Sequence, residues 1–236
     1  GCFDDPNDYN RGDVHCWDVW HGLKPFEDYR DKYPRFCSEF GFESFPSLKT
    51  VESFTLPEDR NIFSRVMESH QKCIGGNGKI LYYLSQNYRY PTTLAHVLYA
   101  SQLLQAEAMR AGVEHWRRYR GRCMGAIYWQ LNDIWPVASW ASIDSFGRWK
   151  ALHYAAKRFF APVLVSCERK GMALRVSVVN DTLADFHGKA EVRLLTARGE
   201  TLRTDALFVD VAPLTAAWVH TLTVEGAVGA PHPEDG

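Results

Sequence analysis

The chain has 236 residues, of which 46% are hydrophobic and 23% are charged, and its formal net charge is −1. This composition excludes a disordered chain, which needs fewer apolar residues and a larger net charge. A net charge near zero gives no overall attraction to phosphate, and no apolar run approaches the roughly 18 residues of a membrane span. We therefore expect neither nucleic acid nor a membrane as a partner.

In the first two thirds of the chain, expected strands alternate with expected helices, which is typical of a parallel α/β architecture. The expected strands cover 14–17, 35–40 and 125–131. Helices are predicted to begin at Pro25, Ser47 and Pro57, and further helices to cover 60–72 (closed by Gly75-Gly76), 93–118 and 149–160.

After Pro162 the helical patterns stop, and apolar and polar residues alternate over 174–178, 190–194, 207–211 and 218–224. Turn signals separate these segments, as in a β-sandwich, and four or five strands fit. The expected domains are 1–162, a partial sandwich over 163–228, and a disordered tail over 229–236. Three strand–helix units cannot close a barrel, so we expect the chain to be part of a longer protein.

Aromatic and sulfur-containing residues give unequal information. Eight tryptophans are present, and six of them fall in two short stretches, a density that favours the lining of a site: Trp17, Trp20, Trp129, Trp135, Trp140 and Trp149. The six cysteines are irregularly spaced and contain no C-x-x-C pair, which indicates free thiols. The nearest metal-like spacing, His70-x-x-Cys73, is a poor one, so no metal site is expected.

Carboxylate, amide and aromatic side chains follow the three expected parallel strands at their carboxyl ends, where ligands bind in α/β barrels. Glu39 ends the second strand, just before Gly41. Flat indoles beside polar groups suit a sugar, whose C–H faces stack on rings while its hydroxyls form hydrogen bonds. The candidate substrate-binding residues are Trp129, Trp17, His15, Trp20, Asn132 and Asp133.

Each of these residues also has a structural interpretation. A glutamate at a strand end can be a salt-bridged group, Trp129 can be a core residue, and Asn132-Asp133 can cap a turn. His15 and His21 are six residues apart, a poor spacing for a pair of metal ligands, so stacking is the expected role of this segment.

Four segments together resemble one family of glycosidases. They are 13–22, 38–47 with Ser-Glu-Phe-Gly-Phe, 128–136 with Tyr-Trp-Gln-Leu-Asn-Asp, and 138–162. Over most of residues 10–165 the chain is similar to the β-mannosidases of glycoside hydrolase family 2. The resemblance implies an α/β fold that is the C-terminal part of a TIM (β/α)8 barrel, followed by a partial immunoglobulin-like β-sandwich.

The resemblance also implies roles for individual residues. Glu39 matches the catalytic nucleophile on the seventh barrel strand, and Trp129 matches the aromatic floor of the sugar subsite. His15, Trp17 and Trp20 lie in the segment that borders this subsite. The family's mechanism is retaining and uses a second carboxyl group about 5–5.5 Å from the nucleophile, with no cofactor.

The chain departs from the family pattern at three points. Cys16 stands where a tyrosine is expected, and Glu43 stands where a glutamine is expected. The family's general acid is the glutamate of an Asn-Glu pair, which residues 1–236 lack. Glu43 shares a loop with Glu39 and cannot face it across a barrel. We therefore expect the acid and the first five strands to lie outside this chain, and the chain alone to be inactive.

Two further motifs are expected to be structural. The run 116–122 combines four arginines with two aromatic residues, as nucleic-acid-binding segments do, but it ends the longest helix, where cations complement the helix dipole. Asn180-Asp181-Thr182 is a glycosylation sequon at an expected turn, and we interpret it as a chance occurrence.

The leading functional hypothesis is a retaining exo-glycosidase that removes terminal β-D-mannose from the non-reducing ends of β-mannosides. The rest of the same polypeptide would be needed to close its barrel. One alternative is another family-2 exo-glycosidase, acting on β-galactosides or β-glucuronides. A second is a non-catalytic sugar-binding module, which has no need for the carboxylate of Glu39. The compartment stays open: cytoplasmic in a bacterium, lysosomal or secreted in a eukaryote.

Overall fold

The computed structural model describes residues 8–223. The chain divides into two compact units. The first unit holds the residues up to 116 together with 122–160, and the second holds 117–121 together with the residues from 161 onward. The segment 117–121, at the end of the longest helix, thus belongs to the second unit, which a division by composition at residue 162 leaves out.

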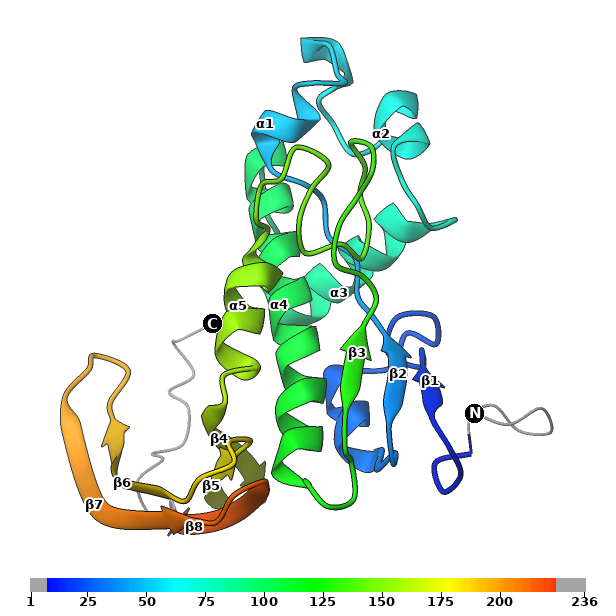
Figure 1. Ribbon diagram of the computed structural model, residues 1–236. Helices are drawn as coiled ribbons and strands as arrows, with labels where there is room; N and C mark the ends of the chain where they lie inside the picture. The colour runs from blue at the N-terminus through cyan, green and yellow to red at the C-terminus, as the bar shows by residue number, and fades with distance from the viewer. Residues whose placement is uncertain (1–7, 224–236) are drawn as a thin grey trace. The chain divides into compact units, whose positions relative to one another are not determined.

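Three short strands form a parallel sheet in the first unit, in the order β1-β2-β3, and their arrows point the same way in Figure 1. They are β1 (Val14–Cys16), β2 (Cys37–Phe40) and β3 (Ala126–Tyr128). The central strand pairs Glu39 with His15 of β1 and Phe40 with Tyr128 of β3. The parallel sheet predicted from the sequence is confirmed, with shorter strands than expected, and its three carboxyl ends lie at one edge.

Seven helical segments accompany this sheet within residues 8–223: η1 (Phe26–Asp31), α1 (Leu48–Val51), η2 (Pro57–Asp59), α2 (Arg65–Ser69), α3 (Gly76–Asn87), α4 (Leu94–Arg118) and α5 (Ala151–Phe159). The two 3₁₀ segments are η1 and η2. Helix α4 runs alongside the sheet in Figure 1, and its Leu104, Ala108 and Met109 are buried in the same core as Phe40. The expected helices over 93–118 and 149–160 are confirmed to within two residues.

The helix expected over 60–72 is wrong in its extent, because only the five residues of α2 are helical there. The hydroxyl oxygen of Ser64 accepts a hydrogen bond from the backbone N–H of Met67 at 3.1 Å and so sets a later helix start. Gly75, with a φ of 70°, stands before the first residue of α3 and does not close a preceding helix. The sequence interpretation therefore missed α3.

The second unit contains five antiparallel strands in two sheets, β4-β5-β8 and β6-β7, within the described range. They are β4 (Val163–Lys170), β5 (Ala173–Asn180), β6 (Phe186–Leu195), β7 (Thr201–Val211) and β8 (Thr215–Thr223). Val178, Val209 and Val211 form its buried cluster. The strands expected from alternation are confirmed, and the tail expected to be disordered, 229–236, lies outside the described residues.

Strand β4 has no hydrophobic alternation in its sequence because two of its inward residues are polar. Ser166 and Glu168 are both buried. Arg118 reaches them, with a guanidinium nitrogen 2.6 Å from the Ser166 hydroxyl and another 4.0 Å from the Glu168 carboxylate. An inward polar residue that has such a partner is stable in a core but invisible to a hydrophobicity pattern.

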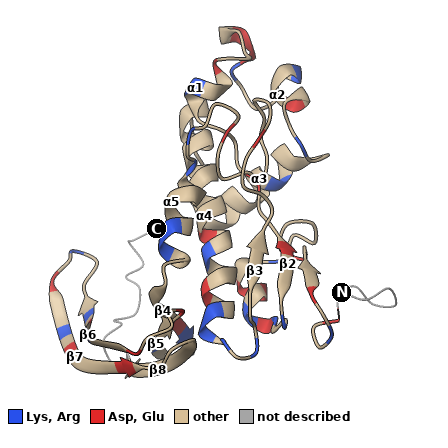
Figure 2. Ribbon diagram, in the orientation of Figure 1, with Lys and Arg blue, Asp and Glu red and all other residues tan. Residues whose placement is uncertain are grey.

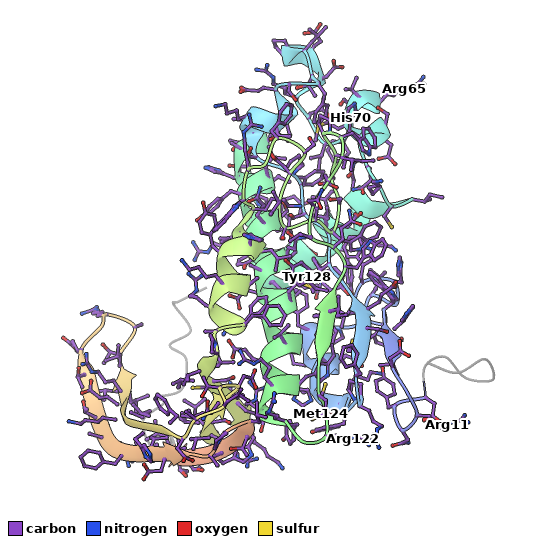
Figure 3. The ribbon with its side chains drawn as sticks, viewed as in Figure 1. Arg11, Arg65, His70, Arg122, Met124 and Tyr128 are labelled. Carbon is purple, nitrogen blue, oxygen red and sulfur yellow. The ribbon has the colours of Figure 1, made fainter. Side chains whose placement is uncertain are left out.

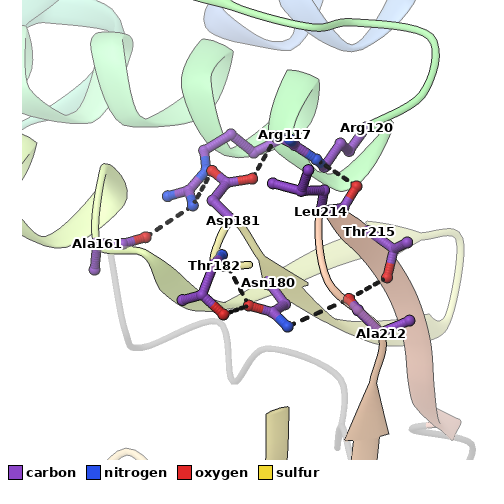
Figure 4. A network of polar contacts seen from close by, with 9 residues as sticks. All are labelled: Arg117, Arg120, Ala161, Asn180, Asp181, Thr182, Ala212, Leu214 and Thr215. Carbon is purple, nitrogen blue, oxygen red and sulfur yellow. Dashed lines mark hydrogen bonds and ion pairs between the residues drawn. The ribbon is translucent and has the colours of Figure 1, made fainter. Parts of the chain in front are cut away.

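The basic run and the sequon both have structural roles in the second unit, as Figure 4 shows. Arg117 donates to the carbonyl oxygen of Ala161 and to the carboxylate of Asp181, both at 2.8 Å, and Arg120 also pairs with Asp181. Asn180 is fully buried, and its amide nitrogen donates to three backbone carbonyls, including those of residues 184 and 211. The amide that a glycan would modify is therefore engaged inside the sheet.

Charged residues of both signs lie along α4 (Figure 2), where Arg110 pairs with Glu107 and Glu114. Alternating charges spaced three or four residues apart are typical of a solvated helix face. Within residues 8–223, no helix is both long enough and apolar enough to cross a membrane.

Candidate functional site

The strand carrying Glu39 brings three candidate residues together at the carboxyl edge of the parallel sheet. His15 is paired with Glu39 in the register of β1 and β2, so the two side chains leave the same face. The imidazole Nδ1 of His15 lies 3.3 Å from the Oε2 of Glu39. The indole Nε1 of Trp17 donates to the same oxygen at 3.1 Å. The carboxylate is therefore held by one residue of the adjacent strand β1 and by one residue just after it.

The Glu39 carboxylate remains reachable from solvent. Its side chain is 30% exposed and that of His15 is 52% exposed. A carboxylate that is fixed by a tryptophan N–H and still partly open has the properties that a nucleophile needs, because it can contact a substrate without reorganising.

Trp129 directly follows β3 in sequence and lies beside β2, the strand that carries Glu39. Its backbone N–H donates to the carbonyl of Phe40 at 2.8 Å, and the residue is 44% exposed. In Figure 3 the chain passes from Met124 through the strand to Tyr128 and then into the loops beyond the sheet. Trp129 therefore stands at the same edge as Glu39, with ring surface available for stacking.

At Gly41 the segments that carry the candidate residues come close together. A Cβ on Gly41 would lie 2.5 Å from the carbonyl oxygen of Trp129 and 2.9 Å from the Cη2 of Trp17. It would also lie 3.0 Å from the Cδ1 of Trp140. Only glycine fits there without moving one of these residues.

Trp140 belongs to the aromatic wall beside Glu39, although sequence reasoning did not assign it to the site. The centroid of its ring lies 6.1 Å from that of Trp17 and 6.3 Å from that of Trp20. Trp20 itself is fully buried and packs against Phe42 at 4.9 Å between centroids. Trp20 therefore lies in the core behind the wall. The clustering of tryptophans was the one signal in the sequence that pointed to Trp140.

The two polar candidates after β3 lie in different surroundings. Asn132 is exposed, and its amide nitrogen contacts the carbonyl of Asp133 at 3.3 Å. Asp133 is buried, accepts from the hydroxyl of Ser139 at 2.8 Å, and has its pKa raised by burial. Asn132 can meet a ligand directly, whereas Asp133 supports the loop from inside.

Glu43 belongs to a buried group of charges. Both it and Lys150 are nearly free of exposure, and the Lys150 ammonium donates to the carbonyls of Ser44 and Ser139 at 3.1 and 3.2 Å. Burial holds the pKa of Glu43 well above its usual range, although Lys150 opposes the shift. Burial also lowers the pKa of Lys150 to about 8, against the pull of Asp133 and Glu43. These groups thus compensate one another inside the protein.

Metal-ligating residues do not gather in the described part of the chain. Within residues 8–223, no group of three or more His, Cys, Asp or Glu side chains could hold a metal ion. His70 stacks on Phe54 with 3.9 Å between ring centroids, and its Nδ1 lies 2.6 Å from the carbonyl of Pro136. The ring of His70 is thus engaged in packing and in a hydrogen bond within the protein.

Known proteins match the chain in both units. Residues 172–235 match the family model described as Mannosidase Ig/CBM-like domain. Beta-mannosidase B of Emericella nidulans is 34% identical over 94% of the chain, and that of Aspergillus terreus is 42% identical over 67% of it. The crystal structure of a beta-D-mannosidase from Dictyoglomus thermophilum matches 94% of the chain with 32% identity and a TM-score of 0.85. The chain is homologous to a part of the beta-mannosidases.

The resemblance to β-mannosidases predicted from the sequence is thereby confirmed. The chain spans 29% of the Emericella nidulans beta-mannosidase B, 20% of the Aspergillus terreus protein and 28% of the Dictyoglomus thermophilum chain. An exo-chitosanase from Amycolatopsis orientalis is 21% identical, covers 89% of this chain and has a TM-score of 0.71, with 26% of its own chain covered. That likeness shows a shared fold.

Proposed function

We propose that this chain supplies the nucleophile side of the active site of a retaining exo-β-mannosidase, with Glu39 as the nucleophile. One observation carries the proposal: the Glu39 carboxylate is partly exposed at the carboxyl edge of a parallel sheet and accepts from Trp17 at 3.1 Å. The sequence similarity to beta-mannosidases covers the strands that form this edge.

Glu39 would act in two steps. Its carboxylate oxygen attacks the anomeric carbon of a terminal β-mannoside, the bond to the leaving oxygen breaks, and a general acid gives that oxygen a proton. In the second step the residue that acted as the general acid takes a proton from water. The water attacks the glycosyl–Glu39 ester, which frees the Glu39 carboxylate and releases mannose with retained configuration. The hydrogen bond from Trp17 fixes the oxygen that faces it, which leaves the attacking carboxylate oriented.

The sugar would be held by the residues around this carboxylate. The ring of the half-exposed residue Trp129 would form the floor, since the C–H face of a sugar stacks on an indole. His15 and Trp17 would form the side wall, and Asn132 would offer its amide to a hydroxyl. Buried Trp20 would support this wall from behind, and Asp133 would support the loop that carries Asn132.

The three parallel strands would be the last three of a (β/α)8 barrel, and the β-sheet unit the immunoglobulin-like domain after it. The face of the sheet that carries Ile127 supports this proposal, because Ile127 is 57% exposed in the chain by itself. Inward-pointing side chains of the other barrel strands would cover it. The general acid would then come from polypeptide outside residues 1–236, and the chain alone would have no turnover.

The test is the variant Glu39→Gln in the full-length enzyme, assayed with an aryl β-mannoside, β-galactoside and β-glucuronide. We expect a loss of about 10⁴-fold or more in kcat on the mannoside, because an amide cannot form the glycosyl ester. The matched control is Glu27→Gln, which changes an exposed glutamate of η1 and should leave kcat unchanged. Full turnover by Glu39→Gln would overturn the proposal. If the wild type cleaved only the galactoside or the glucuronide, the proposed mannoside substrate would be wrong.

A further inference from the structure

Several polar residues are buried on helix α4, and two of them, Ser101 and Gln105, lie one helical turn apart. Ser101 and Gln105 have no exposed surface. An amide side chain in a core is costly unless its polar atoms are hydrogen-bonded. The hydrogen bonds of Gln105 must therefore offset the cost of burying its amide, and the groups it bonds indicate its role.

Every polar atom of the Gln105 side chain is engaged. Its amide oxygen accepts from the hydroxyl of Ser44 at 2.7 Å. Its amide nitrogen donates to the carbonyl of Phe42 at 2.7 Å and to that of Trp140 at 3.1 Å, with the carbonyl of Ala141 at 3.4 Å. Both polar atoms of this glutamine are thus hydrogen-bonded to backbone and side-chain groups that are more than thirty residues away in sequence.

These partners belong to two loops. Phe42 and Ser44 lie in the nucleophile loop, residues 41–47, which follows the strand of Glu39. Trp140 lies in the tryptophan loop, residues 129–144, which follows β3. The two loops pair directly where Ser44 and Ser139 exchange backbone hydrogen bonds of 3.0 and 3.2 Å. Gln105 fastens both loops to α4 beside this short bridge.

A short path leads from Gln105 to the Glu39 carboxylate. Trp140, whose carbonyl Gln105 holds, contacts Trp17 edge-on with 6.1 Å between ring centroids. Trp17 in turn donates to Glu39. A movement of Trp140 would press on Trp17 and change the angle and length of the bond that fixes the carboxylate.

We propose that Gln105 is a positioning residue for the nucleophile. It sets the distance between the nucleophile loop and the tryptophan loop and thereby orients Trp17 and Glu39. The inference rests on the proposed function, because it assumes that Glu39 is the attacking group. It adds a residue on a distant helix that touches neither the sugar nor Glu39.

The test measures Gln105→Met in the full-length enzyme with an aryl β-mannoside whose leaving group departs without a proton. Acid assistance is then unnecessary, so kcat/KM reports the attack of the nucleophile. We expect kcat/KM per folded enzyme to fall about 10- to 100-fold, since small displacements of reacting groups have effects of this size. The inhibition constant of a mannose-configured competitive inhibitor should change less than about threefold, because ground-state binding does not depend on the orientation of the attacking oxygen.

Two further variants keep the test decisive. Ser44→Ala removes one of the Gln105 bonds and should lower kcat/KM about fivefold even if Gln105→Met does not fold. Gln86→Met changes an exposed glutamine of α3 and should change nothing. Wild-type kcat/KM in folded Gln105→Met, or in Ser44→Ala, would overturn the positioning role. If instead Glu39→Gln retained turnover, the proposed function would fail and Gln105 would not be at issue.

Discussion

The two units of the chain bury polar side chains for different purposes. In the first unit, Gln105 and Lys150 donate to loop carbonyls at the carboxyl edge of the sheet. In the second, Asn180 donates to carbonyls near strand ends and closes a turn of the antiparallel sheets. The first arrangement lies beside a partly exposed carboxylate, and the second lies beside no candidate residue.

The lengths of the strands explain this contrast. The parallel strands have three or four residues each, so their ladders cannot hold the long loops that follow them. The antiparallel strands have eight to eleven residues and are held along their whole length by ladder bonds. Where backbone pairing is short, buried side chains position the loops. We therefore expect buried polar groups of the first unit to affect catalysis, and those of the second to affect only stability.

Among the variants that test this comparison, Lys150→Met should have the largest effect on stability. It removes the buried ammonium that attracts the Asp133 carboxylate and frees two loop carbonyls. We expect the free energy of unfolding to fall by about 3–5 kcal/mol, and kcat to fall in the fraction that remains folded. Denaturant unfolding and steady-state assays measure both. Lys157→Met, at an exposed position of α5, is the control and should stay within about 0.5 kcal/mol.

Gly41→Ala should mainly lower catalytic activity. The new Cβ would lie 2.5 Å from the carbonyl oxygen of Trp129, so the backbone around Trp129 must shift. We expect kcat/KM for an aryl β-mannoside to fall about 100-fold, or about 2.7 kcal/mol. Gly78→Ala is the matched control, because a Cβ there meets nothing within 4 Å. Equal activities of the two variants would show that the close approach at Gly41 does not shape the site.

Asn180→Ala tests the other half of the comparison. It leaves backbone carbonyls of the second unit without their donor, and we expect a loss of about 2 kcal/mol in the free energy of unfolding. At temperatures below the unfolding transition, kcat should equal that of the wild type. The exposed Thr221→Ala, on β8, serves as the control for stability. A fall in kcat for Asn180→Ala would break the distinction between the two units.

The expected effect of Glu43→Gln depends on pH. Burial raises the pKa of Glu43, so above about pH 4.3 the unfolded state loses a proton that the folded state keeps. The free energy of unfolding of the wild type is therefore reduced as pH rises from that value toward the raised pKa. Glutamine has no such proton, so the Tm of Glu43→Gln minus that of the wild type should increase between pH 4.5 and pH 8. A constant difference would show that Glu43 is ionised normally in the folded protein.

Helices and strands with a regular hydrophobic period could be predicted from the sequence. Structure that depends on an individual side-chain hydrogen bond could not. The stripe of α4 and the alternation of β5 to β7 predicted their elements correctly, because one buried face repeats every 3.6 or 2 residues. Strand β4 was not assigned because Ser166 and Glu168 replace apolar residues on its inner face. Helix α2 was predicted too long because the cap at Ser64 lies inside a continuous apolar pattern.

The same limit applies to the candidate site. The motif around Glu39 and the residues His15 and Trp17 could be placed together from the parallel order of the strands. The burial of Trp20 and Asp133 could not, because neighbouring residues after a strand end face either core or solvent according to the turn that follows. Gln105 lies inside the expected helix 93–118, where the local sequence does not set it apart. Its role depends on loop carbonyls far away in sequence, which no local pattern reveals.

The most direct test of the central claim is to identify the residue that attacks the sugar. The full-length enzyme is incubated with a 2-fluoro-mannosyl fluoride, which forms the glycosyl ester but releases it slowly, and the labelled peptide is identified by mass spectrometry. We predict one added fluoro-mannosyl group per chain, on Glu39 within Cys37–Phe40 of β2. A label on any other carboxylate, Glu43 included, would contradict the account.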